Sequence, residues 1–467
     1  MGLFNNSMGF MGSILRGTST VSFWTGNMIY TALQNAHTKK EIKTLYKHAA
    51  DANFHNRAVA LLPGLSKKEL LLTTGEPDDN DIYDYQTKSN TAALDYIWGQ
   101  GDATESLVIS GGNNDERIKA LIPFIYRAQT SSNLQPIVIL YSGNQPLKNM
   151  ISKYSREVGF IDKNELYYDV FRGMPTDDIA TLLYDTIPEG LATPVAESLL
   201  RAAVEVLLRT DGAVNLHNLG TLQLNQLETT IDSMFSQGLF SKDEYNDIKS
   251  DYKAGASETA SVRIFLNKLY KQADSVYGKP NRDKSNIKAM LRRGSAIAID
   301  VGKTGTELLI SLVIHHLELL HLQGKDFVLV IDELSPARFP SLCNLIRAGS
   351  YAICNADFIS SLHGTHQGDD LFEELTGNVK TTVLFRHSSG STCQRWSEHL
   401  GTYRKIRIKW GLAQNNSFMN SSNSRDLRVD EVDEPRVRAE SLQALPNSVA
   451  CIYTMDGILI ANVTEPN

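Results

Sequence analysis

The stretch Phe327-Val-Leu-Val-Ile-Asp332-Glu333 joins five consecutive apolar residues to two carboxylates. An unbroken apolar run of this length is typical of a strand that is buried on both faces of a parallel sheet. Such a strand delivers its acidic end to the edge of the sheet. There Asp332 is suited to holding Mg²⁺ through water, and Glu333 to orienting or deprotonating an attacking water. The stretch therefore has the form of a Walker B element. The alternative is a strand whose acidic end only caps the next helix.

Similar apolar runs alternate with helical patterns on both sides of this stretch. Further strands are expected at Ser106–Ser110, Pro136–Tyr141, Ala296–Asp300, Phe358–Leu362, Thr381–Phe385 and Lys405–Lys409. A helical pattern covers Asp115–Gln129, and a long amphipathic helix begins near Leu308 and is stopped by Gly324. This alternation predicts an α/β fold with a RecA-like, doubly wound, mainly parallel sheet, which binds ligands at the carboxyl ends of its strands.

The 467 residues are too many for one typical core, so the chain should divide into domains. From about residue 190 to 290, β-branched runs disappear and helical periodicity takes over, starting at the expected N-cap pair Thr193-Pro194. We expect an N-terminal α/β lead-in (1–98), the first part of a RecA-like domain (99–190), an all-helical insertion (191–290), the second part of the RecA-like domain (291–412), and a flexible loop with a C-terminal segment (413–467). In the last part, Asn415–Ser424 is expected to be the loop and Ser448–Val463 a hairpin.

Composition is that of an ordinary globular protein, with 42% hydrophobic and 21% charged residues. Because the net charge is −7, non-specific binding of nucleic acid would need a local basic patch such as Arg404–Lys409. The four cysteines lack CxxC spacing, which favours a reduced, cytoplasmic setting. The sequence contains no run of about 18 apolar residues, so no membrane-spanning helix is predicted. Arg16 is the only charged residue among the first 37, so this segment is expected to pack on its own domain or on a partner, with a peripheral membrane contact as the alternative.

A phosphate loop of the pattern G-x-x-x-x-G-K-[ST] should lie between an early strand and its helix. That place holds Gly111-Gly112-Asn113-Asn114-Asp115-Glu116-Arg117-Ile118, which keeps only the first glycine of the pattern. Glu116 adds a negative charge where backbone N–H groups should cradle phosphate, and Ile118 removes the hydroxyl that ligates Mg²⁺. Arg117 keeps the charge but not the compact ammonium group. ATP with Mg²⁺ on Asp332 is therefore a doubtful ligand. Its remaining contacts would come from Gly111, Gly112, Asn113, Asn114 and Arg117.

A second segment, Gly302-Lys303-Thr304, also follows a strand and precedes a helix. The pattern requires a glycine five positions before Gly302, but Ile297 stands there, inside the strand. An incidental turn with an N-cap is favoured over a phosphate site.

Five histidines gather near these elements. His315, His316 and His321 lack the carboxylate of an HExxH motif, so structural histidines are favoured over metal ligands. His363 and His366 follow the expected Phe358–Leu362 strand, where a sensor would point, and plain loop polarity is the alternative.

In the order of its elements, the chain over about residues 100–465 resembles the TraG/TraD-like coupling ATPases of type IV secretion and conjugation, which are relatives of the HerA/FtsK translocases. The matching parts are Ser106–Ile118, Pro194–Arg201, Val328–Glu333, Phe339–Arg347, Ser361–His363, Thr381–Arg386, His399–Gly401 and Leu442–Val449. The resemblance places Walker B at Asp332 and Glu333, an arginine at Arg347, and a sensor at His363 where the family has glutamine. This chain departs from the family in lacking N-terminal membrane helices and in its degenerate Walker A loop.

The resemblance and the residues above lead to three hypotheses, the third of which rests on the basic patch Arg404–Lys409. The first is a coupling-ATPase homologue weakened or inactive in ATP hydrolysis, which acts as an assembly or recruitment subunit of a secretion, DNA-transfer or DNA-defence complex. The second is an active ATP-dependent translocase of DNA or protein that uses an offset or neighbour-supplied phosphate loop. The third is a nucleic-acid-binding module without nucleotide. The expected partners are other subunits of such a complex and DNA, and an oligomer is expected because RecA-type relatives share their nucleotide site between subunits.

Overall fold

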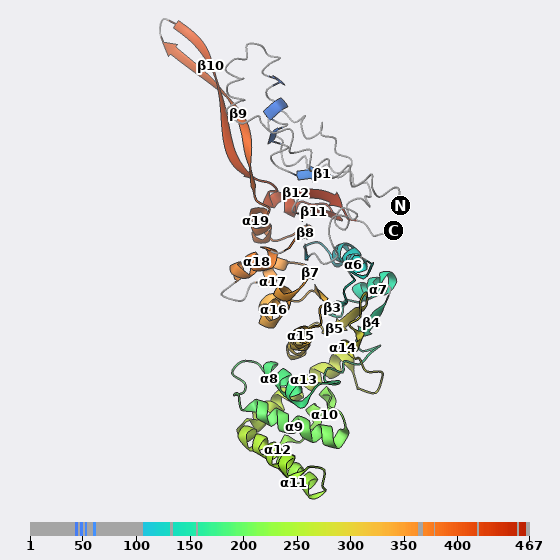
Figure 1. Cartoon of the computed structure of the whole chain (residues 1–467). Helices are drawn as coiled ribbons and strands as arrows, with labels where there is room; N and C mark the ends of the chain where they lie inside the picture. The colour runs from blue at the N-terminus through green and yellow to red at the C-terminus, as the bar shows by residue number, and fades with distance from the viewer. Residues whose placement is uncertain are drawn as a thin grey trace. The chain divides into compact units, whose positions relative to one another are not determined.

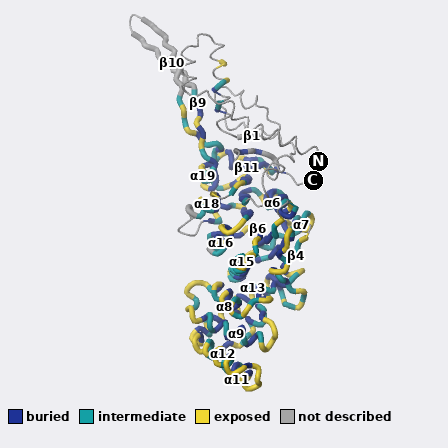
Figure 2. The backbone as a smooth tube through the Cα atoms, in the orientation of Figure 1, coloured by how far each residue is buried: buried dark blue, intermediate teal, exposed yellow. Residues whose placement is uncertain are grey.

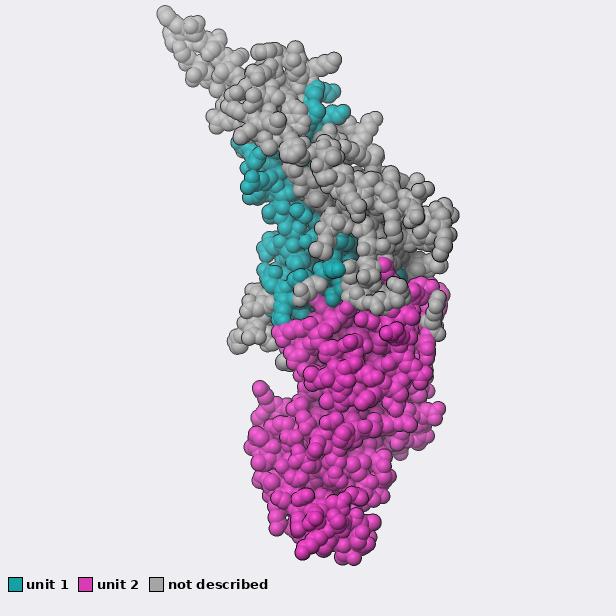
Figure 3. Space-filling view, viewed as in Figure 1, with its two compact units in different colours: residues 1–124, 354–363, 367–467 teal, residues 125–353, 364–366 magenta. Residues whose placement is uncertain are grey.

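The computed structural model describes residues 43–44, 47–49, 52–53, 59–61, 106–130, 134–155, 157–362, 368–377, 379–417, 420–454 and 457–463. The chain divides into two compact units, coloured separately in Figure 3: unit 1 comprises residues 1–124, 354–363 and 367–467, and unit 2 comprises 125–353 and 364–366. The expectations for residues 1–37, His363 and His366 fall outside the described residues. Among the described helices, none is long and apolar enough to cross a membrane.

Unit 1 contains strands in the order β1-β12-β11-β8-β2. Their bounds are β1 (Val59–Leu61), β2 (Leu107–Ser110), β8 (Thr381–Leu384), β11 (Val449–Thr454) and β12 (Gly457–Asn462). The pairs β2–β8 and β1–β12 are parallel, whereas β8–β11 and β11–β12 are antiparallel. The predicted terminal hairpin is thus confirmed as β11–β12.

The helices of unit 1 are α6 (Asn114–Thr130, shared with unit 2 from Ile125), α17 (Phe358–Leu362), α18 (Gly368–Gly377), α19 (Gly390–His399) and α20 (Ala439–Gln443). Rings from three of these helices form an aromatic cluster: Phe358 stacks on Trp396 at 6.0 Å, and Phe372 meets Trp396 edge-on at 5.2 Å. Trp396 is fully buried, so this cluster is a core of unit 1.

The segment Phe358–Leu362 is a helix, and the prediction of a strand there is wrong. The strand is the apolar run before it, β7 (Tyr351–Asn355). Asp357 explains the switch, because its carboxylate accepts hydrogen bonds from the backbone N–H and the hydroxyl of Ser360 at 3.0 and 2.7 Å. An Asp in this position starts a helix by satisfying its first N–H groups.

A two-stranded hairpin, β9 (Thr402–Ser417) paired antiparallel with β10 (Asn420–Pro435), also belongs to unit 1. It contains the expected strand Lys405–Lys409. The prediction of a flexible loop at Asn415–Ser424 is wrong, because Asn415 pairs with Ser422 and Ser417 with Asn420 across the hairpin. Polar Asn and Ser side chains do not prevent backbone pairing, which the composition alone did not show.

Unit 2 has the strand order β6-β3-β5-β4, with the first residues of β7 beside β6. The bounds are β3 (Ile137–Tyr141), β4 (Val158–Ile161), β5 (Ala296–Asp300) and β6 (Val328–Asp332). The pairs β3–β5, β3–β6 and β4–β5 are all parallel. Every residue of β3 and β6 is buried, as their unbroken apolar runs predicted, and Figure 2 shows these strands as dark segments.

Helices alternate with these strands. They are α7 (Gln145–Tyr154), α15 (Glu307–Leu322), η5 (Pro336–Arg338) and α16 (Pro340–Ala348). The predicted long helix is α15, and Gly324 follows it with a φ of 77°, a left-handed conformation that ends helices.

Between β4 and β5 the described chain forms helices, as predicted for the insertion, and they are the green and yellow-green segments of Figure 1. They are α8 (Thr176–Asp185), α9 (Ala196–Asp211), α10 (Leu216–Thr221), η3 (Leu224–Gln226), α11 (Leu227–Ser236), α12 (Lys242–Gly255), η4 (Ala256–Glu258), α13 (Thr259–Tyr277) and α14 (Ile287–Met290). The helical part begins with α8, upstream of residue 191. Thr193 is not the N-cap of α9, because its hydroxyl donates to the carboxylate of Glu258 at 2.6 Å.

Candidate functional site

The segment Gly111–Ile118, which the sequence predicted to be a degenerate phosphate loop, connects β2 to α6 in unit 1 and includes the first turns of α6. Gly111 and Gly112 both have positive φ values, 86° and 64°. A Cβ on Gly111 would come within 2.5 Å of the ring of His387, and one on Gly112 within 2.6 Å of the carboxylate of Glu116. The two glycines therefore allow close approach to protein side chains.

Glu116 fills the loop from within. Its carboxylate oxygens accept hydrogen bonds from the backbone N–H of Asn113 at 2.7 Å and from that of Ser448 at 2.5 Å. In return the side chain of Asn113 accepts from the N–H of Glu116 at 2.9 Å, which completes a capping box at the start of α6. The side chain at the position of the second pattern glycine thus bonds N–H groups in the way that a phosphate would in a working loop. Ser448, from the segment before β11, was not foreseen, since nothing in its local sequence links it to this loop.

The backbone N–H groups of Gly111 and Gly112 also have partners within unit 1. The N–H of Gly112 donates to the carbonyl of Arg386 at 2.8 Å, and that of Gly111 to the carbonyl of Ala356 at 3.1 Å. Arg117 is buried with its guanidinium under the loop, where it donates to the carbonyls of Gly111 and Gly112. A guanidinium that bonds carbonyls in this way holds the loop shape and is not presented to a ligand.

Of two further residues of the segment, Ile118 follows the sequence prediction, whereas Asp115 does not present the second carboxylate to a ligand that was expected of it. Ile118 is buried in the core, so no hydroxyl stands at the position that ligates Mg²⁺. Asp115 points outward and pairs with Lys119 at 2.6 Å, so only one of the two loop carboxylates faces inward.

A buried Ser110–His387 pair supports the loop from below. His387 Nδ1 lies 2.8 Å from the carbonyl of Phe385, so this nitrogen carries the proton and Nε2 accepts the hydroxyl hydrogen of Ser110 at 2.9 Å. Burial lowers the pKa of His387, although Asp357 opposes this shift. A neutral imidazole therefore holds the end of β2, and sequence reasoning missed it because Ser110 and His387 lie far apart in the chain.

In unit 2, Asp332, which the sequence predicted to be a Walker B carboxylate, ends β6 and is completely buried. The side-chain amide of Asn144 donates to it at 2.9 Å, while the carbonyl oxygen of the same amide caps α7 by accepting from Leu147. Asn144 was not predicted, although its place between a strand and Gln145-Pro146 is typical of an N-cap. Glu333 is exposed and has a φ of 57°, a left-handed conformation that is strained for a residue with a side chain.

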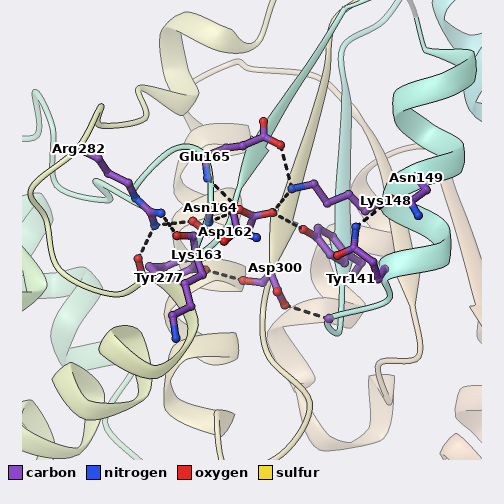
Figure 4. Close-up of polar contacts among 12 residues, drawn as sticks. Tyr141, Lys148, Asn149, Asp162, Lys163, Asn164, Glu165, Tyr277, Arg282 and Asp300 are labelled. Carbon is purple, nitrogen blue, oxygen red and sulfur yellow. Dashed lines mark hydrogen bonds and ion pairs between the residues drawn. The ribbon is translucent and has the colours of Figure 1, made fainter.

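The carboxyl edge of unit 2 also carries a polar network, drawn in Figure 4. Asp162, just after β4, accepts hydrogen bonds from the hydroxyl of Tyr141 at 3.2 Å and from the ammonium of Lys148. Burial alone would raise the pKa of Asp162, but the bonds from Lys148 and from backbone N–H groups hold it below its ordinary value. Arg282 donates to the carbonyls of Asp162, Lys163 and Tyr277. These bonds join the segment after α13 to the segment that follows β4.

Three other residues considered in the sequence analysis, Arg347, His316 and His315, each bond another protein side chain. Arg347 is exposed on α16 and donates to Asn344 at 3.2 Å. His316 is a core residue, as favoured, since Tyr168 bonds it at 2.8 Å and burial lowers its pKa to about 3. His315 bonds the hydroxyl of Ser341 at 2.7 Å.

The basic stripe of β9 is largely neutralised. Glu434 accepts the ammonium of Lys405 at 3.1 Å and also pairs with Arg407 and Arg438. Lys405 and Glu434 are both buried. Lys405 is thus removed from the surface that a nucleic acid would contact, and Arg407, which is partly exposed, has its charge paired with Glu434.

ATP and Mg²⁺, the two predicted cofactors, each require a particular set of protein groups. In the part of the chain that the structure describes, no group of three or more His, Cys, Asp or Glu side chains is arranged to hold a metal ion. A phosphate loop needs free backbone N–H groups and a hydroxyl for Mg²⁺, whereas Glu116 occupies the former and Ile118 replaces the latter. The residues of this loop therefore do not fit ATP with Mg²⁺.

Comparison with solved structures identifies the fold. The unbound bacterial conjugative coupling protein TrwBdeltaN70 aligns with a TM-score of 0.54 and 14% identity over 81% of this chain and 92% of that chain. TrwB in complex with a non-hydrolysable GTP analogue gives a TM-score of 0.51 at 14% identity, over 81% and 93%. TrwB in complex with ADP and Mg²⁺ gives 0.50 at 15%, over the same shares. No protein-family model matches the sequence, and no curated protein is significantly similar to it. The chain has the RecA-like α/β fold of the TrwB coupling proteins, which confirms the predicted fold class and resemblance.

Proposed function

We propose that this chain is a coupling-protein-like subunit that has lost ordinary ATP binding at its phosphate loop and acts in assembly or recruitment. The observation that carries the proposal is the Glu116 carboxylate, which accepts the N–H groups of Asn113 and Ser448 inside the loop. The fold is that of TrwB, whose solved structures include complexes with a GTP analogue and with ADP and Mg²⁺. The fold thus supports descent from a nucleotide-binding scaffold, and the loop supports loss of the ligand.

Electrostatics supports this loss. A phosphate entering the loop would have to displace Glu116 or lie beside it. Two unit charges of the same sign at 4 Å repel by about 4 kcal/mol at an effective dielectric constant near 20. This repulsion corresponds to about a thousandfold in affinity. Arg117 does not offset it, because its guanidinium is bonded to the carbonyls of Gly111 and Gly112.

The proposed role is that of a subunit in a secretion, DNA-transfer or DNA-defence complex, either as a homo-oligomer or beside an active ATPase. Arg347 and Arg386 are both exposed, so each is accessible to a neighbouring subunit. Such an arginine would complete the site of an active partner, as in the arrangement that the resemblance implies.

The competing function is an active ATPase that uses another loop or a neighbour's phosphate-binding element. A titration of the full chain with a fluorescent ATP analogue and Mg²⁺ separates the two. We expect no micromolar binding that depends on residues 111–118 or on Asp332. Micromolar binding that Asp332→Ala abolishes would overturn the proposal, because it would show a working Walker B carboxylate.

A repaired loop provides the positive arm of the experiment. Glu116→Gly, Arg117→Lys and Ile118→Thr together restore the cradle, the compact cation and the Mg²⁺ ligand, so this variant should bind the analogue more tightly. Asp115→Asn is the matched control, because Asp115 points away from the loop. A folded triple variant that binds no better than the wild type would show that residues 111–118 are not a former phosphate loop.

Assembly is tested by light scattering on the full chain and on a variant that lacks residues 1–36. We expect an oligomer, or capture of a partner ATPase, that the deletion weakens more than it weakens folding. A strict monomer in both forms at micromolar concentration, with no partner recovered, would contradict the assembly role.

A further inference from the structure

The loop from Gly302 to Thr306 in unit 2 connects β5 to α15 and was favoured as an incidental turn. Its sequence is Gly-Lys-Thr-Gly-Thr, and Gly302 and Gly305 have positive φ values of 76° and 70°. Lys303, Thr304 and Gly305 are exposed, whereas Thr306 is only 4% exposed. The loop therefore combines an accessible cationic rim with a buried hydroxyl.

The hydroxyl of Thr306 has no hydrogen-bond partner within the described residues. It does not cap α15, although Thr306 is the N-cap residue. A Cβ placed on Gly302 would lie 2.7 Å from the methyl carbon and 3.1 Å from the hydroxyl oxygen of Thr306, so the Thr306 side chain packs against Gly302 within the loop. A buried hydroxyl without a partner is unfavourable in a folded protein. Its retention here is explained if a ligand atom reaches it.

The surrounding groups are donors. Within the described chain, no acceptor is recorded for the backbone N–H groups of Thr306, Glu307 and Leu308, which open the 16-residue helix α15. Leu309, the next residue, donates to the side-chain oxygen of Gln272 at 3.0 Å, so the free donors end there. The start of a helix carries a partial positive charge, which favours an anion.

Lys303 adds a full positive charge to these donors. A Cβ on Gly143 would lie 3.3 Å from Cε of Lys303, so the stem of the lysine lies across Gly143 at the carboxyl end of β3. Lys303 is exposed, and none of the ion pairs found within the described residues includes it. Its ammonium is therefore available to a ligand at the same edge of unit 2 that carries Asp332.

Two carboxylates lie close enough to oppose an anion. Asp300 accepts the N–H groups of Gly302 and Gly143 at 2.9 and 3.0 Å, which directs its carboxylate toward the backbone of the loop. Burial raises the pKa of Asp300, and the hydrogen bonds from Gly302 and Gly143 oppose this shift. Glu307 is exposed and can extend into solvent. The donors therefore outnumber the opposing charges at the mouth of the loop.

We propose that the Gly302–Thr306 loop binds a phosphate group, held by Lys303, by the first N–H groups of α15 and by the hydroxyl of Thr306. A terminal phosphate offers several strong acceptor oxygens and two negative charges, which match this set of donors. The site lies in unit 2 and does not depend on the loss of nucleotide binding at residues 111–118 of unit 1. The phosphate can belong to a free nucleotide or to the 5′ end of a nucleic acid strand.

Calorimetric titration of the full chain with inorganic pyrophosphate is the primary test. Lys303→Ala and Thr306→Val should each weaken binding about tenfold or more, the effect of losing one hydrogen bond to a charged group. Lys268→Ala, which removes an exposed lysine elsewhere in unit 2, should leave it unchanged. ATP and a pair of oligonucleotides with and without a 5′-phosphate identify the source of the phosphate.

Thermal unfolding distinguishes a binding site from a structural defect. Without ligand, Thr306→Val should unfold at the same or a higher temperature than the wild type, because it removes a buried hydroxyl and keeps the shape. With pyrophosphate the wild type should gain stability and this variant should not. The proposal is overturned if the wild type binds none of the probes, or if both variants bind them as the wild type does. ATP binding that Lys303→Ala removes but Glu116→Gln leaves intact would belong to this loop alone.

Discussion

Replacement of Glu116 tests the internal filling of the phosphate loop most directly. Glu116→Gln keeps the size of the side chain but removes its charge and turns one acceptor oxygen into an NH₂ donor. One of the two backbone N–H groups, of Asn113 or of Ser448, then faces another donor. A hydrogen bond to a charged group contributes about 1.5–3 kcal/mol, and a buried donor left without an acceptor costs a similar amount.

We therefore expect Glu116→Gln to destabilise unit 1 by about 2 kcal/mol, and Glu116→Ala by somewhat more. Urea unfolding, followed through the first transition of the full chain, measures the change. Hydrogen exchange should localise it, with faster exchange of the N–H groups of Asn113 and Ser448 than of those in β6.

Asp115→Asn is the matched control, because it removes a neighbouring carboxylate that is exposed and paired with Lys119. Exposed pairs of this kind contribute about 0–1 kcal/mol. The interpretation fails if Glu116→Gln is no more destabilising than Asp115→Asn, or if exchange near Ser448 is unchanged. Either result would mean that Glu116 does not bond these groups in solution.

Three further predictions concern stability. Lys148→Ala leaves the buried carboxylate of Asp162 without its cation, so it should lower the unfolding free energy by about 3 kcal/mol in urea titrations at pH 7. Because His316 is buried and neutral, its folded pKa of about 3 lies below the ordinary 6.5, so the unfolded state binds the proton first. The contribution of neutral His316 to the free energy of unfolding is complete above pH 6.5 and should fall by about 2 kcal/mol at pH 5. The measurement is the free energy of unfolding as a function of pH, which should fall less steeply below pH 6.5 in His316→Phe than in the wild type. Asn53→Ala removes two hydrogen bonds to the backbone of Ile406, so the N–H of Ile406 should exchange faster by about tenfold.

Each of these three predictions has a result that would contradict it. Lys268→Ala, at an exposed lysine, should leave stability unchanged, and a destabilisation equal to that of Lys148→Ala would remove the case for a buried pair. An acid slope that is the same in His316→Phe as in the wild type would contradict the role of His316. If Asn53→Ala leaves exchange at Ile406 unaltered, the amide does not bond the hairpin.

The strands and helices that the sequence determined are those with a strong local signal. The run Phe327–Ile331 lacks polar residues, so it had to be covered on both faces, and it forms most of β6, which pairs parallel with β3. The insertion was recognisable because helical periodicity is written into consecutive residues. The departure of residues 111–118 from the phosphate-loop pattern was also visible in the sequence, since Glu116 and Ile118 stand where the pattern has glycine and a hydroxyl residue.

The secondary-structure prediction was wrong where a short segment is compatible with two conformations. Phe358–Leu362 is apolar enough for a strand, but the carboxylate of Asp357 caps a helix there, and a cap is a contact of one or two atoms. Asn415–Ser424 looked like a loop because its residues are polar, yet pairing across the hairpin depends on the partner strand.

Tertiary structure alone decided what the loop contains. Glu116 was expected to repel a phosphate, and the structure gives it two bound N–H groups, one of them from Ser448, far along the chain. Asn144 on Asp332 and His387 on Ser110 are likewise contacts between distant segments. Hydrophobic periodicity repeats every few residues and can be read along the chain, whereas a hydrogen bond between remote residues depends on how the whole sheet brings them together.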